Sequence, residues 1–143
     1  MISVAVVNQK GGVAKTTTSA NLAVGLAVSG YRVLAIDLDP QAHLTLSLKV
    51  DSTKVGTEET VAPLFSSRRP DVRTLIVATA VDNVRLIPST IRLATVEKRF
   101  SDTPRWESRV LKALEQVHDD FDWVIMDCPP DLHPLCERDC CCG

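Results

Sequence analysis

Several features that would assign a class of protein are missing from this sequence of 143 residues. Its 16 basic and 18 acidic residues leave a formal net charge of −2, so the overall charge does not indicate a nucleic-acid or membrane-binding surface, and any DNA contact would have to be local. No apolar stretch reaches the roughly 18 residues of a membrane span, and no basic segment precedes a signal-like core. These absences predict a cytoplasmic protein.

The cysteines do not provide the framework of a disulfide-stabilised domain. Four of the five lie close together, at Cys136, Cys140, Cys141 and Cys142. A zinc site is disfavoured there, because three consecutive thiols cannot easily occupy three corners of one tetrahedron and no C-x-x-C pair is present. We therefore expect residues 131–143 to be a divergent, cysteine-rich tail.

Apolar runs alternate with helical periodicity along the chain. This pattern predicts an α/β fold with a mostly parallel sheet and helices on both faces. We expect one domain over residues 1–130, because a chain of this length can bury one core. The apolar runs that predict strands are 2–7, 33–36, 84–87 and the second part of 121–127. The expected helices are one that ends at Gly30, a short one over 58–65 and one over 105–118.

Residues 8–18, which read Asn-Gln-Lys-Gly-Gly-Val-Ala-Lys-Thr-Thr-Thr, predict a phosphate-binding loop between a strand and a helix. In such a loop, backbone N–H groups, a helix N-terminus and a lysine ammonium all point at one polyphosphate. Lys15 is expected to reach the β- and γ-phosphates, and the Thr16 hydroxyl to ligate Mg²⁺. The residues expected to bind the nucleotide are Lys10, Gly11, Gly12, Val13, Ala14, Lys15, Thr16 and Thr17.

Carboxylates follow two further apolar runs. Asp37 and Asp39 belong to the segment D-L-D-P-Q, and Asp127 begins D-C-P-P. Because ligands of open α/β sheets bind beyond the carboxyl ends of the strands, all three should lie near the phosphate loop. Asp127 is the expected Walker B residue that holds Mg²⁺ through its water shell. The residues alone leave open which of Asp37 and Asp39 serves the metal and which orients an attacking water.

The phosphate loop follows a variant pattern. The ordinary pattern G-x-x-x-x-G-K-[ST] fails, because its glycines fall on Gln9 and Ala14, whereas K-G-G-x-x-K-[ST]-T is satisfied from Lys10 to Thr17. With D-L-D-P-Q, I-P-S at 87–89 and D-C-P-P in the same order, the chain up to about Pro130 resembles the ParA/MinD family of deviant Walker A ATPases. The resemblance is strongest to the Soj-like ParA ATPases that partition chromosomes and plasmids.

The resemblance implies a switch driven by ATP and Mg²⁺. Asp39 would activate the attacking water and Asp37 would support Mg²⁺, together with Thr16 and Asp127. Lys10 would reach the nucleotide of the other subunit in a nucleotide-sandwich homodimer. Lys10, Lys15 and Asp39 are thus the expected catalytic residues. In the family, the dimer binds DNA without sequence preference, associates with the nucleoid, and responds to a ParB-like partner that stimulates hydrolysis.

Two departures from the family pattern lead to further expectations. Ala14 stands where glycine is more usual, and its methyl group would crowd the phosphates if this position has positive φ; we expect slower turnover rather than lost binding. Family members usually continue well past Asp127, so we expect a C-terminally truncated ATPase half with an out-of-frame tail, the alternative being a naturally minimal relative. Truncation would leave the strand ending at Asp127, or its neighbour, as an uncovered sheet edge.

Three other functions compete with the partitioning switch. A non-catalytic, truncated nucleotide-binding fragment is favoured by the short chain, and a turnover measurement separates it from the switch. A MinD-like division-site regulator is disfavoured, because the tail does not predict the amphipathic helix that serves as its membrane anchor. A nitrogenase-iron-protein-like reductase is disfavoured as well, because Cys128 and the bunched tail lack the spacing of cluster ligands.

Overall fold

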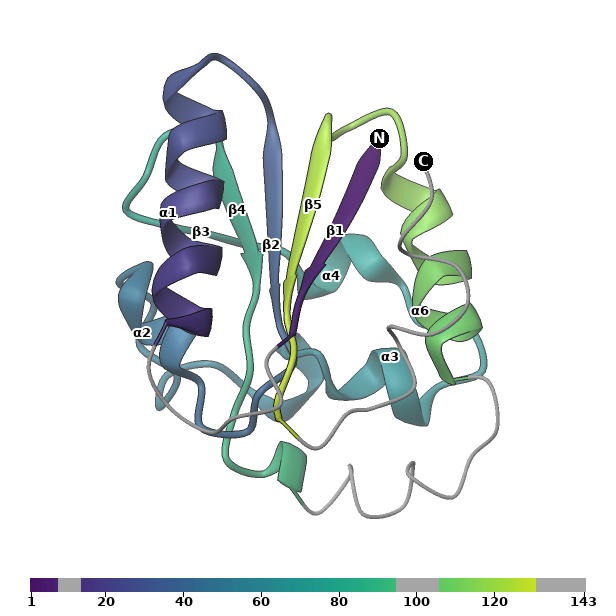
Figure 1. Ribbon diagram of the computed structural model, residues 1–143. Coiled ribbons are helices and arrows are strands. Elements are labelled where there is room, and N and C mark those ends of the chain that lie inside the picture. Colours follow the sequence, from purple (N-terminus) through teal and green to yellow (C-terminus); the bar gives the residue numbers. More distant parts are fainter. Residues whose placement is uncertain (8–13, 95–105, 131–143) are drawn as a thin grey trace.

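A mostly parallel sheet forms the centre of the computed structural model, which describes residues 1–7, 14–94 and 106–130 (Figure 1). Its strands are β1 (Ile2–Val6), β2 (Val33–Asp37), β3 (Val77–Ala78), β4 (Val84–Ile87) and β5 (Trp123–Asp127). Within the described residues, they lie in the order β1-β5-β2-β4-β3. Every neighbouring pair is parallel except β3 and β4. The predicted α/β class with a mostly parallel sheet is therefore confirmed.

Helices cover both faces of this sheet, as predicted. The helical elements are α1 (Lys15–Val28), α2 (His43–Ser47), α3 (Ala62–Ser66), α4 (Val72–Leu75), α6 (Trp106–Leu114) and two 3₁₀ turns, η1 (Thr57–Glu59) and η2 (Glu115–Val117). Figure 1 shows α1 and α2 on one side of the sheet and α3, α4 and α6 on the other. The buried apolar residues form two clusters that correspond to these two sides.

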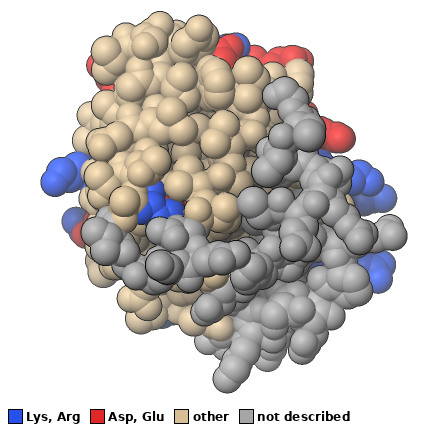
Figure 2. All heavy atoms as spheres, viewed as in Figure 1, with Lys and Arg blue, Asp and Glu red and all other residues tan. Residues whose placement is uncertain are grey.

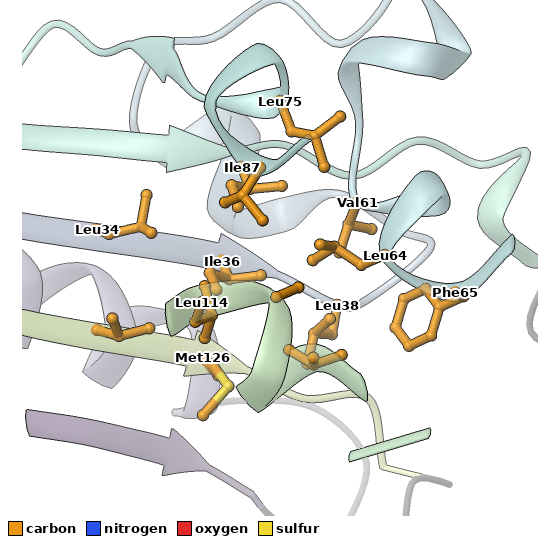
Figure 3. Packing of buried hydrophobic residues seen from close by; sticks show 14 of the residues in the cluster. Leu34, Ile36, Leu38, Val61, Leu64, Phe65, Leu75, Ile87, Leu114 and Met126 are labelled. Atoms are coloured by element: carbon orange, nitrogen blue, oxygen red, sulfur yellow. The ribbon is translucent and has the colours of Figure 1, made fainter. Parts of the chain in front are cut away.

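Strand β2 supplies both clusters because it lies in the middle of the sheet. All five of its residues are buried, and successive side chains point to opposite faces. Val33 and Ala35 pack in the cluster that includes α1 and α2. Leu34 and Ile36 pack in the cluster of the other face, which is shown in Figure 3. Burial on both faces explains why this strand is a continuous apolar run in the sequence.

The end of α1 matches the prediction that the helix stops at Gly30. This residue has a φ of +92°, which favours glycine. The Gly30 N–H donates to the Ala27 carbonyl at 3.0 Å, and the Tyr31 N–H donates to the Leu26 carbonyl at 3.1 Å. This pair of hydrogen bonds is a Schellman motif, which returns the chain toward β2.

The prediction of one short helix over 58–65 is wrong. The segment contains η1 and the start of α3, separated by Thr60 in an extended conformation. The Thr60 hydroxyl donates to the Thr57 carbonyl at 2.6 Å and accepts from the Ala62 N–H at 3.3 Å, so it replaces backbone hydrogen bonds that a continuous helix would make. Pro63 then lies in the first turn of α3, where proline is tolerated.

Two other elements differ from the sequence analysis. The antiparallel strand β3 was not predicted, because a strand of two residues is too short to show an alternating pattern. The helix expected over 105–118 is α6 followed by η2, so its last turn is 3₁₀ rather than α. Residue 105 and the tail over 131–143, with its cysteines, lie outside the described residues.

Strand β1 is the outermost strand on its side of the described sheet. It pairs with β5, whereas β5 lies between β1 and β2. The strand that ends at Asp127 is therefore internal, and its neighbour β1 is the edge strand within the part of the chain that the structure describes. Ile2 on β1 is 52% exposed.

The surface view in Figure 2 shows one face of the molecule. Charged side chains lie mainly at its margins, and the described surface between them is mostly uncharged. None of the helices in the described ranges combines the length and the apolar character that crossing a membrane requires.

Candidate functional site

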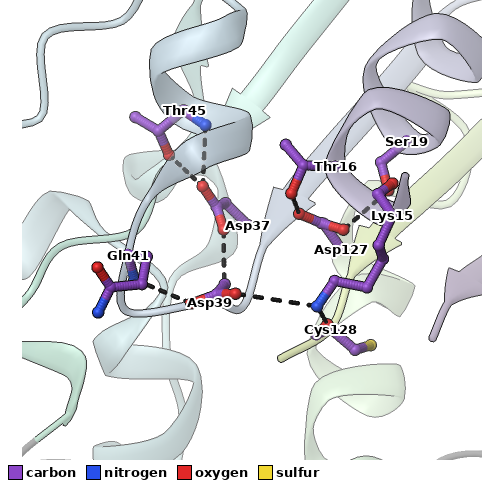
Figure 4. A network of polar contacts seen from close by, with 9 residues as sticks. All are labelled: Lys15, Thr16, Ser19, Asp37, Asp39, Gln41, Thr45, Asp127 and Cys128. Carbon is purple, nitrogen blue, oxygen red and sulfur yellow. Dashed lines mark hydrogen bonds and ion pairs between the residues drawn. The ribbon is translucent and has the colours of Figure 1, made fainter. Parts of the chain in front are cut away.

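Three strand ends meet at one edge of the sheet. Strand β1 leads into the predicted phosphate loop, β2 ends at Asp37 and β5 ends at Asp127. Asp127 is in register with Val6 on one side and with Asp37 on the other, so the three ends are level. This is the edge where open α/β sheets bind ligands. Figure 4 shows the polar side chains that gather there.

Asp127 is held by two hydroxyl groups from the first turns of α1. The Thr16 hydroxyl donates to Oδ2 and the Ser19 hydroxyl to Oδ1, each at 2.9 Å. Thr16 and Ser19 are three residues apart, so they lie on the same face of the helix. The Ser19 hydroxyl also lies 3.0 Å from the Lys15 carbonyl. Burial raises the pKa of Asp127, and the two hydroxyl groups oppose that rise.

The Lys15 ammonium connects the end of β5 with the loop after β2. Its Nζ donates to the Cys128 carbonyl and lies 3.8 Å from Asp39 Oδ2. Only 10% of the Lys15 side chain and 14% of the Asp39 side chain are exposed. The ion pair is therefore largely shielded from water, which strengthens the attraction between its charges relative to a surface pair.

Asp37 is completely buried, and its carboxylate accepts three hydrogen bonds. The Thr45 N–H and the Thr45 hydroxyl donate to Oδ2 at 2.8 and 2.7 Å, and the Asp39 N–H donates to Oδ1 at 3.1 Å. Burial raises the pKa of Asp37 to about 7, and the three hydrogen bonds limit the rise. Asp37 therefore joins the end of β2 to α2.

Asp39 lies just past the end of β2, so the alternation of the strand does not extend to it. Its Oδ1 accepts from the Gln41 N–H at 2.9 Å, and its Oδ2 faces Lys15. The loop continues through Ala42, which has a φ of +54°. As Figure 4 shows, Asp37 points toward Thr45 and Asp39 toward Lys15. The two aspartates of D-L-D-P-Q thus contact different partners.

The structure brings together the described members of the predicted site. Thr16 bonds Asp127, Lys15 faces Asp39, and Asp37 accepts from the Asp39 N–H. Lys15 joins the two sets, because its ammonium donates to the carbonyl of Cys128, the residue after Asp127. The predicted nucleotide-binding residues Lys10, Gly11, Gly12 and Val13 lie outside the described residues.

Ala14 and Thr17, which were also assigned to nucleotide binding, are exposed at the start of α1. Ala14 has a φ of −110°. The condition for crowding by its methyl group, a positive φ, is therefore not met, and this removes the reason for expecting slower turnover.

Sequence reasoning missed three contributors to this site. Ser19 could have been found, because it lies one helical turn after Thr16. Thr45 and the carbonyl of Cys128 carry no sequence signal, since their roles depend on contacts between segments that are separate in the chain.

The donor set of Thr16 and Asp127 fits Mg²⁺. Both supply oxygen, the ligand type that this ion prefers. In the described ranges, no group of three or more His, Cys, Asp or Glu side chains could hold a metal by itself. This is compatible with Mg²⁺, which usually keeps several waters and takes further oxygens from substrate phosphates. The oxygens of Asp37, in contrast, are already engaged by three donors.

Comparison with known proteins gives consistent matches. A family model described as AAA domain matches residues 1–140. The chain is 44% identical over 129 residues to the sporulation initiation inhibitor protein Soj of Bacillus subtilis, a match that covers 90% of this chain and 50% of Soj. It is 37% identical over 133 residues to the chromosome partitioning protein ParA of Caulobacter vibrioides, covering 92% of this chain and 49% of ParA.

A solved structure is similar to this chain as well. The cobyrinic acid a,c-diamide synthase of Mycobacterium smegmatis, with a bound ATP analog and magnesium, matches with a TM-score of 0.80 and 40% identity. The match covers 90% of this chain and 51% of that one. The chain spans about half the length of Soj and of ParA.

Proposed function

The chain belongs to the ParA/MinD family of P-loop ATPases, and from this membership we propose that it binds ATP with Mg²⁺ and acts as an ATP-dependent switch in DNA segregation. The observation that carries the proposal is the hydrogen bond between Thr16 and Asp127. It places the hydroxyl that follows the loop lysine beside the carboxylate at the end of β5. A Mg²⁺ ion bound to nucleotide phosphates needs these two kinds of oxygen.

Nucleotide binding is assigned to Lys15 and the N-terminus of α1. The ammonium of Lys15 lies between two oxygen groups, the Cys128 carbonyl and Asp39 Oδ2. The β- and γ-phosphates of ATP would replace these partners. Lys10 to Val13 would supply the backbone N–H groups around the phosphates.

Hydrolysis is assigned to Asp39. The Gln41 N–H fixes Oδ1, so Oδ2 is the oxygen left to accept a proton from an attacking water once Lys15 turns to the phosphates. Bound Mg²⁺ would neutralise charge on the phosphates, held by Thr16 and, through its water shell, by Asp127 with support from Asp37. Lys10 of a second copy would add a further positive charge in a nucleotide-sandwich homodimer.

The cellular role follows from the named relatives. ParA of Caulobacter vibrioides is a chromosome partitioning protein, which supports DNA as the cargo. We accordingly assign the chain a homodimer that forms with ATP, a ParB-like stimulating partner and a cytoplasmic location, and we keep non-specific DNA binding and nucleoid association as properties of intact family members.

Isothermal titration calorimetry tests whether Lys15 binds the nucleotide. ATP–Mg²⁺ is titrated into the wild-type chain, into Lys15→Ala and into Lys112→Ala, a matched loss of an exposed lysine on α6. We expect binding to the wild type and to Lys112→Ala, and none to Lys15→Ala. Absence of binding to folded wild-type protein would overturn the proposal.

Phosphate release from the same samples tests the switch. We expect turnover by the wild type that Asp39→Ala abolishes without loss of binding. Binding with no turnover by the wild type would instead support the alternative of a non-catalytic nucleotide-binding fragment.

A further inference from the structure

A chain of hydrogen bonds runs from the end of β4 to Lys15. It begins at the Ser89 N–H, which donates to the Thr45 hydroxyl at 3.1 Å. The Thr45 hydroxyl donates to Asp37, and the other oxygen of Asp37 accepts from the Asp39 N–H. The Asp39 side chain then faces Lys15. Figure 4 shows these contacts from Thr45 to Lys15.

The Thr45 hydroxyl has only one possible orientation in this arrangement. The Ser89 N–H can only donate, so the hydroxyl must accept from it. Its single proton is then directed at Asp37 Oδ2, 2.7 Å away. Thr45 and Ser89 are both completely buried, so no water competes for these positions from the surface. Thr45 also gives its own N–H to the same oxygen of Asp37.

This arrangement makes the conformation of the Asp39 loop depend on Thr45. Asp37 holds the Asp39 N–H through Oδ1, and Thr45 holds Asp37 through Oδ2. We propose that Thr45 is the positioning residue for Asp39: by orienting the Asp37 carboxylate, it sets the loop so that Asp39 faces the phosphate site. The catalytic part of this inference rests on the proposed function, in which Asp39 directs the attacking water.

The proposal also explains why an I-P-S segment lies next to the site. Ser89 contributes its backbone N–H to Thr45, so the end of β4 supports the loop after β2. Displacement of the Asp39 carboxylate would lower the rate of hydrolysis, because attack requires the reacting groups to be aligned. A misplacement of about 1 Å can lower a rate about 100-fold. The proposed function assigns nucleotide affinity to Lys15 and the loop N–H groups, whereas the hydroxyl of Thr45 bonds Asp37 and Ser89.

Three variants separate a positioning role from a general packing role. Thr45→Val keeps the side-chain shape and removes the hydroxyl, whereas Thr45→Ser keeps the hydroxyl. Thr60→Val is the matched control. Thr60 is also completely buried, and its hydroxyl likewise donates once, to the Thr57 carbonyl, and accepts once, from the Ala62 N–H.

Amide hydrogen exchange of the nucleotide-free chain, followed by NMR, tests the structural part. We expect the Asp39 N–H to exchange about 10-fold faster in Thr45→Val than in the wild type, because its acceptor is no longer fixed. Thr45→Ser and Thr60→Val should retain wild-type exchange at Asp39. Unchanged Asp39 exchange in Thr45→Val, or an equal increase in Thr60→Val, would overturn the proposal.

Steady-state ATP hydrolysis tests the catalytic part. We expect Thr45→Val to lower kcat about 10-fold with KM within about 2-fold of wild type, a split that indicates misalignment rather than lost binding. Thr45→Ser should restore kcat, and Thr60→Val should not change it. Loss of Asp39 protection with wild-type kcat would overturn the inference. If the wild-type chain does not hydrolyse ATP, the proposed function fails, and the exchange experiment alone decides whether Thr45 positions Asp39.

Discussion

Asp37 and Asp127 occupy equivalent places at the ends of neighbouring strands, yet they are held by different kinds of partner. They are register partners in the sheet, both are completely buried, and burial raises the pKa of both. Asp37 accepts two backbone N–H groups and one hydroxyl from the loop and helix that follow its own strand. Asp127 accepts two side-chain hydroxyls from α1.

This difference gives the two carboxylates different roles. Asp37 fixes the conformation of a loop, whereas Asp127 is available to a ligand. A backbone N–H can only donate, and its position is fixed by the chain, so Asp37 determines the path of its loop. A hydroxyl can rotate and can accept as well as donate, so Thr16 and Ser19 can leave Asp127 without a change of the backbone. Asp127 is therefore the carboxylate that can turn to a hydrated metal ion.

The largest effect that tests this contrast is the pH dependence of stability. Asp37 has a pKa of about 7 in the folded chain and 3.8 as its reference value. Between these values, the folded chain binds more protons than the unfolded chain, so the free energy of unfolding falls as pH rises from about 4 to 7. The contribution is on the order of 4 kcal/mol, present at low pH and lost above pH 7.

Urea denaturation without nucleotide, from pH 4.5 to 8, measures this dependence. Asp37→Asn should remove most of the slope. Because its amide NH2 group cannot accept from a backbone N–H, it should also lose one of the hydrogen bonds of Asp37 and lower the free energy of unfolding by an amount that does not depend on pH. Asp127→Asn should remove a part as well, because its pKa is also raised. A slope in Asp37→Asn equal to that of the wild type would show that burial does not hold the Asp37 proton.

The next largest effect is expected on the gain in ATP affinity that Mg²⁺ provides. If Asp127 holds the water shell of Mg²⁺, Asp127→Asn should reduce the Mg²⁺-dependent gain in ATP affinity by about 10- to 100-fold. Asp37→Asn should reduce it less, since its oxygens bind Thr45 and Asp39. Calorimetric titrations of ATP with Mg²⁺ and with EDTA give the gain for each variant. Equal losses would instead favour the support of Mg²⁺ by Asp37 that the family resemblance implies.

The central elements of the fold were predictable from the sequence, and the short ones were not. Strand β2 is buried throughout and β4 is buried except at Arg85, and the predicted bounds of both agree with the structure to within one residue. Gly30 was predictable because the left-handed end of α1 requires a residue without a side chain. The break at Thr60 was not, because it depends on a side-chain hydroxyl that competes with backbone hydrogen bonds.

The same division applies to the candidate site. Lys15, Thr16 and the three aspartates were predictable, because a motif places the first two and strand ends place the others. Thr45 was not, because its hydroxyl acquires a role only when α2 folds back against β2 and β4 approaches from the other side. A sequence pattern identifies groups that act on a ligand more readily than groups that hold them.

A smaller effect is expected for Ser19, one of the two hydroxyls on Asp127. Ser19→Ala should lower the free energy of unfolding by about 1 kcal/mol, because Asp127 retains the hydrogen bond from Thr16. It should also raise the pKa of Asp127 further, since the ionised carboxylate loses a donor. Ser29→Ala is the control. Ser29 also bonds the carbonyl four residues earlier, at 3.0 Å, but it is exposed, and among the described residues it has no hydrogen bond to a carboxylate. Urea denaturation compares the two, and equal losses would show that the Ser19–Asp127 bond adds nothing.

The smallest effect concerns Gln41, which belongs to the D-L-D-P-Q signature. Asp39 Oδ1 accepts from the backbone N–H of Gln41, and that group is present whatever the side chain. Gln41→Ala should therefore change the free energy of unfolding of the nucleotide-free chain by less than about 0.5 kcal/mol, as for an exposed substitution. The exchange rate of its own N–H should also stay unchanged. A loss above about 1 kcal/mol would mean that the side chain helps to hold the loop after β2, and that backbone donors alone do not determine its path.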